Sequence, residues 1–173
     1  MTLDSAPLAI GDPAPAFTLP DATGQTISLS QFRGQRVVLY FYPRDNTPGC
    51  TKEACSFRDA YSIYQDKGMV ILGVSTDGPR SHAKFIDKYT LPFPLLADED
   101  AAVATAYGVY GPKKFMGKTY NGITRSTFVI GASGLIEQVY GTGVSSSTGK
   151  ALKIKVDTHA QDVLAGLGFP PES

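Results

Sequence analysis

The stretch Phe41-Tyr-Pro-Arg-Asp-Asn-Thr-Pro-Gly-Cys50-Thr-Lys-Glu-Ala-Cys55 contains both cysteines of this 173-residue chain. A strand-like run from Val37 to Tyr42 leads into a turn rich in Pro, Asn and Gly, and the turn places Cys50 at the start of a helix. The free N–H groups and the positive dipole end at such a position favour the thiolate, which is the nucleophilic form of cysteine. The stretch therefore predicts a reactive thiol at Cys50, with Cys55 as a natural second thiol for a disulfide.

The length and charge of the chain favour one soluble domain, which we expect to span residues 1–173. Sixteen Lys and Arg residues balance sixteen Asp and Glu residues, so neither nucleic acid nor an anionic membrane is a predicted partner. No apolar stretch approaches the ~20 residues that span a bilayer, and the N-terminus does not resemble a secretory signal. We therefore expect a cytoplasmic protein, in which an inert buried cysteine is the plainer alternative for either thiol.

Strand-like and helix-like segments alternate along the chain. Residues 1–15 predict an extended or mobile N-terminal arm, and the segments flanking Asp21-Ala-Thr-Gly24 predict a β-hairpin. This alternation predicts an α/β sandwich, with a central mixed sheet and helices on both of its faces. The further expected elements are strands at 36–42, 69–75, 93–97, 126–130 and 135–140, and helices at 51–67, 79–89, 98–107 and 159–167.

A segment rich in Gly, Ser and Thr precedes the last expected helix. Its composition predicts a flexible surface insertion over residues 141–154. A phosphate-binding loop would end in Gly-Lys-Ser/Thr at the start of a helix, whereas this segment ends in Gly149-Lys150-Ala151. The segment therefore does not predict a phosphate site.

Two sets of residues carry a family resemblance. Pro43, Thr47 and Cys50 match the Pro-x-x-x-Thr-x-x-Cys motif of peroxiredoxins, and the five-residue step to Cys55 resembles the peroxiredoxin Q (bacterioferritin comigratory protein) branch. The segment from Lys114 to Ile130, which contains Arg125, is similar to a later signature of that branch. The similarity runs from about residue 11 to residue 166, and the chain departs from the pattern at 141–154, where the branch normally passes quickly to its last helix.

The resemblance implies a thioredoxin-like sandwich and a thiol-dependent peroxidase that serves antioxidant defence. Cys50 would attack hydrogen peroxide or an organic hydroperoxide and become a sulfenic acid, which Cys55 would resolve as an intramolecular disulfide. Thioredoxin or a similar dithiol donor would then reduce this disulfide. No metal, haem or flavin is implied, and the branch is often monomeric.

Further residues receive roles from the same resemblance. The Thr47 hydroxyl would lie beside the thiolate and hydrogen-bond both the sulfur and a peroxide oxygen. Arg125 would contact the sulfur and favour its ionisation, and Pro43 would shield the pocket from bulk water. Backbone N–H groups at Gly49 and Cys50 are candidates to stabilise the developing negative charge.

Plainer interpretations remain open for several of these residues. Threonine commonly caps helices, so Thr47 could serve only as a cap. Without the surrounding segment, Arg125 would be interpreted as a surface residue beside a strand. Glu53 either favours the helix dipole or has a role near the pocket. Without metal-ligand spacing, His82 and His159 are expected to be structural or surface residues.

Two functions from other classes also remain open. A thiol–disulfide exchanger acting on proteins would use the same thiol chemistry, although such enzymes usually carry Cys-x-x-Cys and four residues separate the cysteines here. A non-catalytic binding domain with incidental cysteines is the second alternative. A metal site is weaker still, because two cysteines without nearby histidines do not complete a tetrahedral set.

Overall fold

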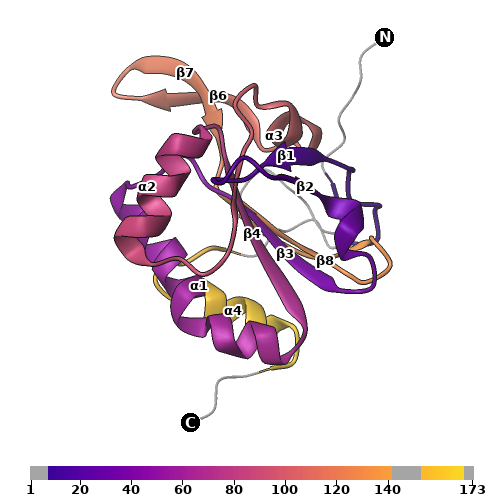
Figure 1. Cartoon of the computed structure of the whole chain (residues 1–173). Helices are drawn as coiled ribbons and strands as arrows, with labels where there is room; N and C mark the ends of the chain where they lie inside the picture. The colour runs from indigo at the N-terminus through magenta and orange to yellow at the C-terminus, as the bar shows by residue number, and fades with distance from the viewer. Residues whose placement is uncertain (1–7, 142–152, 170–173) are drawn as a thin grey trace.

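The computed structural model describes residues 8–141 and 153–169 (Figure 1). A five-stranded sheet lies at its centre. The middle strand pairs in parallel with one neighbour and antiparallel with the other, so the predicted mixed sheet is confirmed. In spatial order the strands are β5 (Leu95–Ala97), β4 (Met69–Ser75), β3 (Arg36–Phe41), β8 (Ser126–Ile130) and β9 (Ile136–Gly141).

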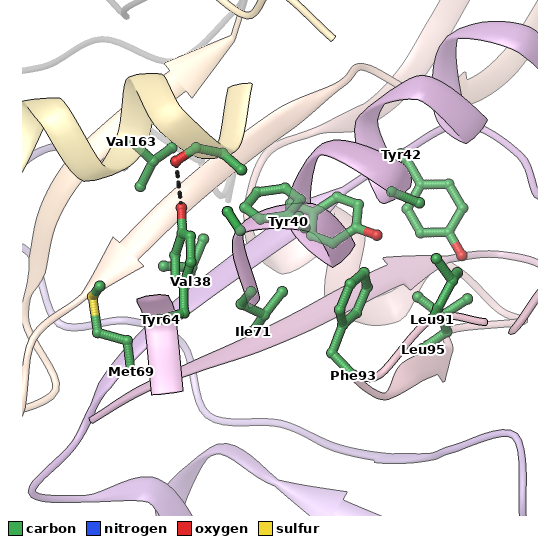
Figure 2. Close-up of a cluster of buried hydrophobic side chains, with 14 of the residues drawn as sticks. Val38, Tyr40, Tyr42, Tyr64, Met69, Ile71, Leu91, Phe93, Leu95 and Val163 are labelled. Atoms are coloured by element: carbon green, nitrogen blue, oxygen red, sulfur yellow. Dashed lines mark hydrogen bonds between the residues drawn. The ribbon is translucent and has the colours of Figure 1, made fainter. Parts of the chain in front are cut away.

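Three helices cover one face of this sheet: α1 (Pro48–Asp66), α2 (Pro79–Tyr89) and α4 (His159–Gly166). Val38 and Tyr40 point to this face because side chains alternate along β3. The Tyr40 ring stacks on Phe57 of α1 with 4.7 Å between ring centroids, within the buried cluster of Figure 2. Burial of side chains of this size stabilises the fold by about 2 kcal/mol each, so α1 is held firmly on β3.

The opposite face is covered by shorter elements. Val37, Leu39 and Phe41 of β3 point to this side and pack in a second buried cluster. The predicted N-terminal hairpin is confirmed, and the helix on this face is short, so helices do lie on both faces of the sheet. These covering elements are β1 (Thr18–Pro20), β2 (Thr26–Ser28), the 3-10 helix η1 (Leu29–Phe32) and α3 (Ala102–Ala106).

Residues 8–15, the described part of the expected N-terminal arm, lie along the start of β9. The N–H of Gly11 donates to the Ile136 carbonyl at 2.8 Å, and the N–H of Ile136 donates to the Asp12 carbonyl at 2.9 Å. The arm makes a turn over residues 9–12, where the N–H of Asp12 donates to the Ala9 carbonyl, and backbone hydrogen bonds fix it to the sheet from residue 11 onward. Most of the expected insertion over 141–154 lies outside the described residues.

The helix predicted over 51–67 begins earlier, at Pro48, and two boundaries on either side of Asp98 are also wrong. The strand predicted over 93–97 begins at Leu95, and the helix predicted over 98–107 spans only α3. Asp98 lies outside the helix, and its carboxylate accepts the N–H groups of Val103 at 3.1 Å and Ala104 at 2.8 Å. An acidic residue expected within the first turn thus caps the helix from outside.

One hairpin was not expected from the sequence. It consists of β6 (Tyr110–Phe115) and β7 (Lys118–Ile123), which pair antiparallel. Met116 and Gly117 between them have positive φ angles of 51° and 78°, as a two-residue type I′ turn requires. Glycine and lysine occur in both strands and proline in β6, so the stretch lacks the apolar alternation that predicts a strand.

The register of β3 and β8 determines where the site forms. Phe41, the last residue of β3, pairs with Ser126, the first residue of β8. The turn that follows β3 and leads to Cys50 therefore lies at the same sheet edge as Arg125, which immediately precedes β8. Antiparallel pairing thus brings together residues that are 75 positions apart in the chain.

Candidate active site

Cys50 lies in the first turn of α1, where it is only 2% exposed. The helix begins with Pro48, and the N–H of Thr51 donates to the Thr47 carbonyl at 2.8 Å. The N–H groups of Gly49 and Cys50 precede this bond, so they have no partner within the helix. The predicted position of Cys50 at a helix N-terminus is confirmed, and the positive dipole end there favours a negative sulfur.

The Arg125 guanidinium bridges two groups on α1. Its Nη2 donates to Cys50 Sγ at 3.2 Å, and its Nη1 donates to Glu53 Oε1. Arg125 is not a surface residue, because its side chain is only 21% exposed. A permanent positive charge at hydrogen-bond distance from a thiol stabilises the thiolate relative to the thiol.

Two glycines leave room for Arg125, one beside its guanidinium and one beside its backbone. A Cβ added to Gly49 would lie 3.2 Å from Arg125 Nη2, closer than most side-chain contacts. At the other end of the residue, a Cβ on Gly141 would lie 2.3 Å from the Arg125 carbonyl oxygen. Gly141 also has a φ of +108°, which side chains rarely adopt, so the backbone beside Arg125 depends on a glycine there.

Glu53 belongs to the site, which decides between the two interpretations left open by the sequence. Its side chain is fully buried, and burial raises its pKa to about 7 even though the Arg125 charge acts in the opposite direction. Oε1 is paired with Arg125, whereas Oε2 has no hydrogen-bond partner within the described part of the chain. Arg125 is therefore the group that makes a buried carboxylate at this position tolerable.

Thr47 occupies the N-cap position of α1 but does not cap the helix with its side chain. Its hydroxyl donates instead to the Arg44 carbonyl at 3.0 Å, within the turn that leads to Cys50. The lone pairs of this hydroxyl remain able to accept a hydrogen bond. Pro43 is half-buried at the start of the same turn.

Cys55 lies further along α1 and is half-buried, and both cysteines are free thiols. Five helical steps separate them by about 140° of rotation and about 7.5 Å along the axis. A disulfide needs Cα atoms within ~7 Å and Cβ atoms that face each other. The helix that presents Cys50 therefore keeps the two sulfurs apart.

Neither histidine lies on the surface. His159 is fully buried, and its Nε2 lies 2.8 Å from Thr127 Oγ1. Burial, together with the nearby Arg125 charge, lowers the pKa of His159 to about 3, so its imidazole is neutral near pH 7. Across residues 8–141 and 153–169, no group of three or more His, Cys, Asp or Glu side chains could hold a metal, and no helix could cross a membrane.

Comparisons with known proteins show the family to which this chain belongs. The AhpC/TSA family model matches residues 10–139. A putative peroxiredoxin bcp of Coxiella burnetii is 45% identical over 160 residues, which cover 92% of this chain and 99% of the relative. A cysteine-to-serine variant of PrxQ from Xylella fastidiosa has a TM-score of 0.83 and 32% identity, over 95% of this chain and 98% of that one.

A second solved structure is a bacterioferritin comigratory protein of Xanthomonas campestris, studied for its alkyl peroxide reduction activity. It has a TM-score of 0.77 and 36% identity, and the match covers 88% of this chain and 90% of that chain. The fold is thus the thioredoxin-like fold of peroxiredoxins. The chain belongs to the AhpC/TSA family, and its peroxiredoxin relatives are peroxidases. More narrowly, its relatives are the peroxiredoxin Q or Bcp proteins, as the motif predicted.

The contact between Arg125 and Cys50 generates the first testable prediction. Arg125→Met keeps much of the stem volume but removes the charge that contacts the Cys50 sulfur, so the negative charge in the transition state loses its partner. We expect the first turnover with peroxide to slow by more than tenfold, which corresponds to about 1.4 kcal/mol or more in the barrier. Stopped-flow kinetics measures this rate, and an unchanged first turnover would contradict the role.

The double variant Glu53→Gln/Arg125→Met is the matched control. In Arg125→Met the Glu53 carboxylate is buried unpaired, so its pKa should rise further above about 7. Folded protein then binds this proton more tightly than unfolded protein, and stability should fall as pH rises from about 4.5 through 7. The double variant should lose this pH dependence in urea unfolding and regain stability, yet stay slow. Recovery of the rate would mean that Arg125 acts only on the fold.

Proposed function

We propose that this peroxidase reduces hydrogen peroxide and organic hydroperoxides through Cys50, with Cys55 as the resolving thiol and thioredoxin or a similar dithiol as the reductant. The observation that carries the proposal is the Arg125 contact with the sulfur of Cys50 at the N-terminus of α1. The alkyl peroxide reduction activity of the Xanthomonas campestris relative supports the inclusion of organic hydroperoxides. We expect the protein to act as a cytoplasmic monomer.

In the first step the Cys50 thiolate attacks one peroxide oxygen in line with the O–O bond. An S–O bond forms, the O–O bond breaks, and the other oxygen leaves as hydroxide or alkoxide and takes up a proton. Cys50 becomes a sulfenic acid, and the peroxide is reduced by two electrons. The Arg125 guanidinium and the unpaired N–H groups of Gly49 and Cys50 stabilise the negative charge during this transfer.

The Thr47 hydroxyl orients the peroxide. Because its proton is donated to the Arg44 carbonyl, the hydroxyl oxygen can accept a hydrogen bond from the protonated end of the peroxide. This contact and the Arg125 charge act on the substrate and the sulfur together. Pro43 borders the pocket at the start of the turn and limits the access of water.

In the second step the Cys55 sulfur attacks the sulfenic sulfur of Cys50, and water leaves as the disulfide forms. A dithiol donor then attacks this disulfide, returns two electrons and restores both thiols. The arrangement of the cysteines on intact α1 does not permit this bond, so the first turns of α1 must unwind. Unwinding exposes Cys55 and the buried Phe57, which offers the reductant a surface to bind.

The two thiols should differ sharply when each is replaced. Cys50→Ser should abolish peroxide reduction, because a serine hydroxyl in this position stays un-ionised. Cys55→Ser should consume one equivalent of peroxide and then stop at sulfenic acid or a higher oxidation state. Peroxide consumption over single and repeated turnovers distinguishes these outcomes. Equal loss of the first turnover in both variants would overturn the assignment.

The unwinding of α1 gives a separate prediction. Amide hydrogen exchange across residues 51–60 should be slow in the reduced protein, because these N–H groups are hydrogen-bonded in the helix that spans Pro48–Asp66. After oxidation, the first two turns should lose their protection, while α4 keeps its own. Equal protection in the two redox forms, with the disulfide confirmed by peptide mapping, would show that the bond closes without unwinding.

A further inference from the structure

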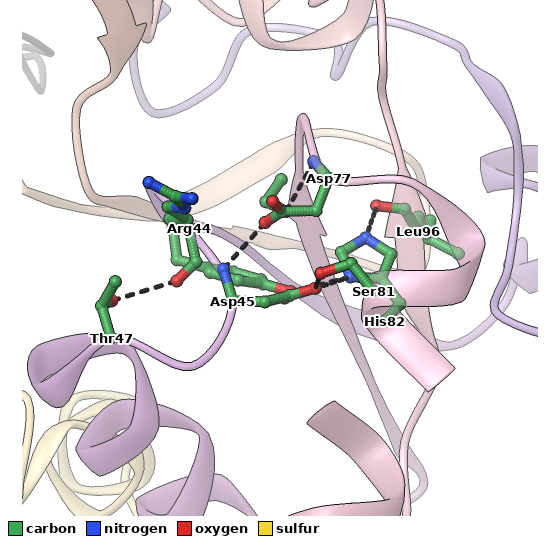
Figure 3. Close-up of polar contacts among 9 residues, drawn as sticks. Arg44, Asp45, Thr47, Asp77, Ser81, His82 and Leu96 are labelled. Atoms are coloured by element: carbon green, nitrogen blue, oxygen red, sulfur yellow. Dashed lines mark hydrogen bonds and ion pairs between the residues drawn. The ribbon is translucent and has the colours of Figure 1, made fainter. Parts of the chain in front are cut away.

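A buried polar cluster lies behind the turn that leads to Cys50, on the side facing α2 (Figure 3). None of its hydrogen bonds involves the sulfur, Arg125 or Glu53. We call it the Asp45 cluster, after the residue on which most of its hydrogen bonds converge. Its members are Tyr42, Asp45, Ser75, Asp77, Ser81 and His82.

The side chain of Asp45 accepts hydrogen bonds from three neighbours. Oδ1 accepts the Tyr42 hydroxyl at 2.5 Å, and Oδ2 accepts the Ser81 hydroxyl at 2.8 Å and lies 2.7 Å from His82 Nδ1. The backbone N–H of Asp45 donates to Asp77 Oδ2 at 2.8 Å. Both the carboxylate and the amide of a single turn residue are thus fixed to α2 and to the segment after β4.

His82 is fully buried, and both of its ring nitrogens face acceptors. Nδ1 lies against the Asp45 carboxylate, and Nε2 lies 2.9 Å from the Leu96 carbonyl oxygen. The imidazole therefore joins Asp45 to Leu96 of β5, and contacts at both ring nitrogens fix its orientation. A buried polar pair of this kind adds little net stability, and its best-attested use is to specify one conformation.

The cluster fixes a tight turn next to the active site. Asn46, which follows Asp45, has a φ of +59°, a left-handed conformation that asparagine adopts more readily than most residues. Thr47 comes next, and its hydroxyl is bonded back to Arg44, on the other side of Asp45. Any movement of Asp45 therefore displaces Thr47 and the first turn of α1. Such a displacement changes the distance from Cys50 to Arg125.

We propose that Asp45 and His82 are positioning residues for peroxide reduction. They hold the turn over residues 43–47 against α2 and the segment after β4. Thr47 then faces the substrate, and Cys50 keeps its hydrogen bond with Arg125. The cluster precedes the part of α1 that unwinds, so it also gives the moving helix a fixed point of attachment. This inference rests on the proposed function, because it concerns the reaction at Cys50.

The test compares Asp45→Asn and His82→Gln with Tyr107→Phe. Tyr107 is a matched control, because its buried hydroxyl donates one hydrogen bond, to the Pro15 carbonyl at 2.7 Å, on the opposite face of the sheet. Asp45→Asn and His82→Gln should each slow the first turnover of folded protein by about tenfold or more, since small displacements of reacting groups have effects of this size. Tyr107→Phe should stay within about twofold of the unaltered protein, whatever stability it loses.

Alkylation of Cys50 by iodoacetamide, in the Cys55→Ser background, provides a readout that does not need peroxide. Asp45→Asn should slow this alkylation near neutral pH, because the sulfur no longer accepts the hydrogen bond from Arg125. If the unaltered protein is alkylated rapidly but does not reduce peroxide, the proposed function fails, while alkylation still tests the positioning. If the variants lose stability but keep normal alkylation and first turnover, the cluster is merely structural and the inference is wrong.

The double variant Asp45→Asn/His82→Gln tests whether the pair acts as a unit. Residues that act through one shared contact are not additive, so the double variant should be about as slow as either single variant. Full additivity of the two rate losses would contradict a shared role. Should Asp45→Asn fail to fold, Tyr42→Phe removes a single hydrogen bond from the same carboxylate and carries the same comparison against Tyr107→Phe.

Discussion

The bridge that Arg125 makes between Cys50 and Glu53 is the constraint on which the rest of the site depends. A guanidinium that is mostly buried needs negative partners, and α1 supplies a carboxylate and a thiol that becomes negative when it ionises. The pairing of β3 with β8 brings the arginine to the correct sheet edge, and Gly49 leaves room for its approach. Fold and chemistry are therefore linked, because the interaction that favours the thiolate also compensates the burial of Glu53.

Under the proposed mechanism, the same helix has to satisfy two opposed requirements. Attack on peroxide needs α1 intact, because its first turn holds Cys50 against Arg125 at the helix end where the N–H groups have no partner within the helix. Formation of the disulfide needs that turn open, because Cys55 lies on another side of the helix. A local opening of this kind costs less than global unfolding when the rest of the structure remains packed. The packing of Tyr64 against α4, at the far end of α1, can persist throughout.

Local patterns predict much of this structure, and their failures have physical reasons. Residues adjacent in the sequence determine both the start of α1 near Pro–Gly–Cys and the apolar run of β3. Both features could therefore be predicted. The contact of Arg125 with Cys50 depends on strand register and could be expected only from family resemblance. Likewise, no local signal reveals that Glu53 faces Arg125 or that Asp45 pairs with His82, because each partner comes from a distant element. The hairpin of β6 and β7 could not be predicted, because its residues are too polar to show the apolar alternation of a strand.

In the proposed reaction, Cys50 reacts with peroxide and Cys55 resolves the product within the same chain. Intact-mass and peptide mass spectrometry of reduced protein, treated with one equivalent of hydrogen peroxide, tests this most directly. We expect the loss of two hydrogen atoms per chain and a single cross-linked peptide pair that joins Cys50 to Cys55. A chain whose mass is unchanged while peroxide persists, or one that forms only disulfides between chains, would contradict it.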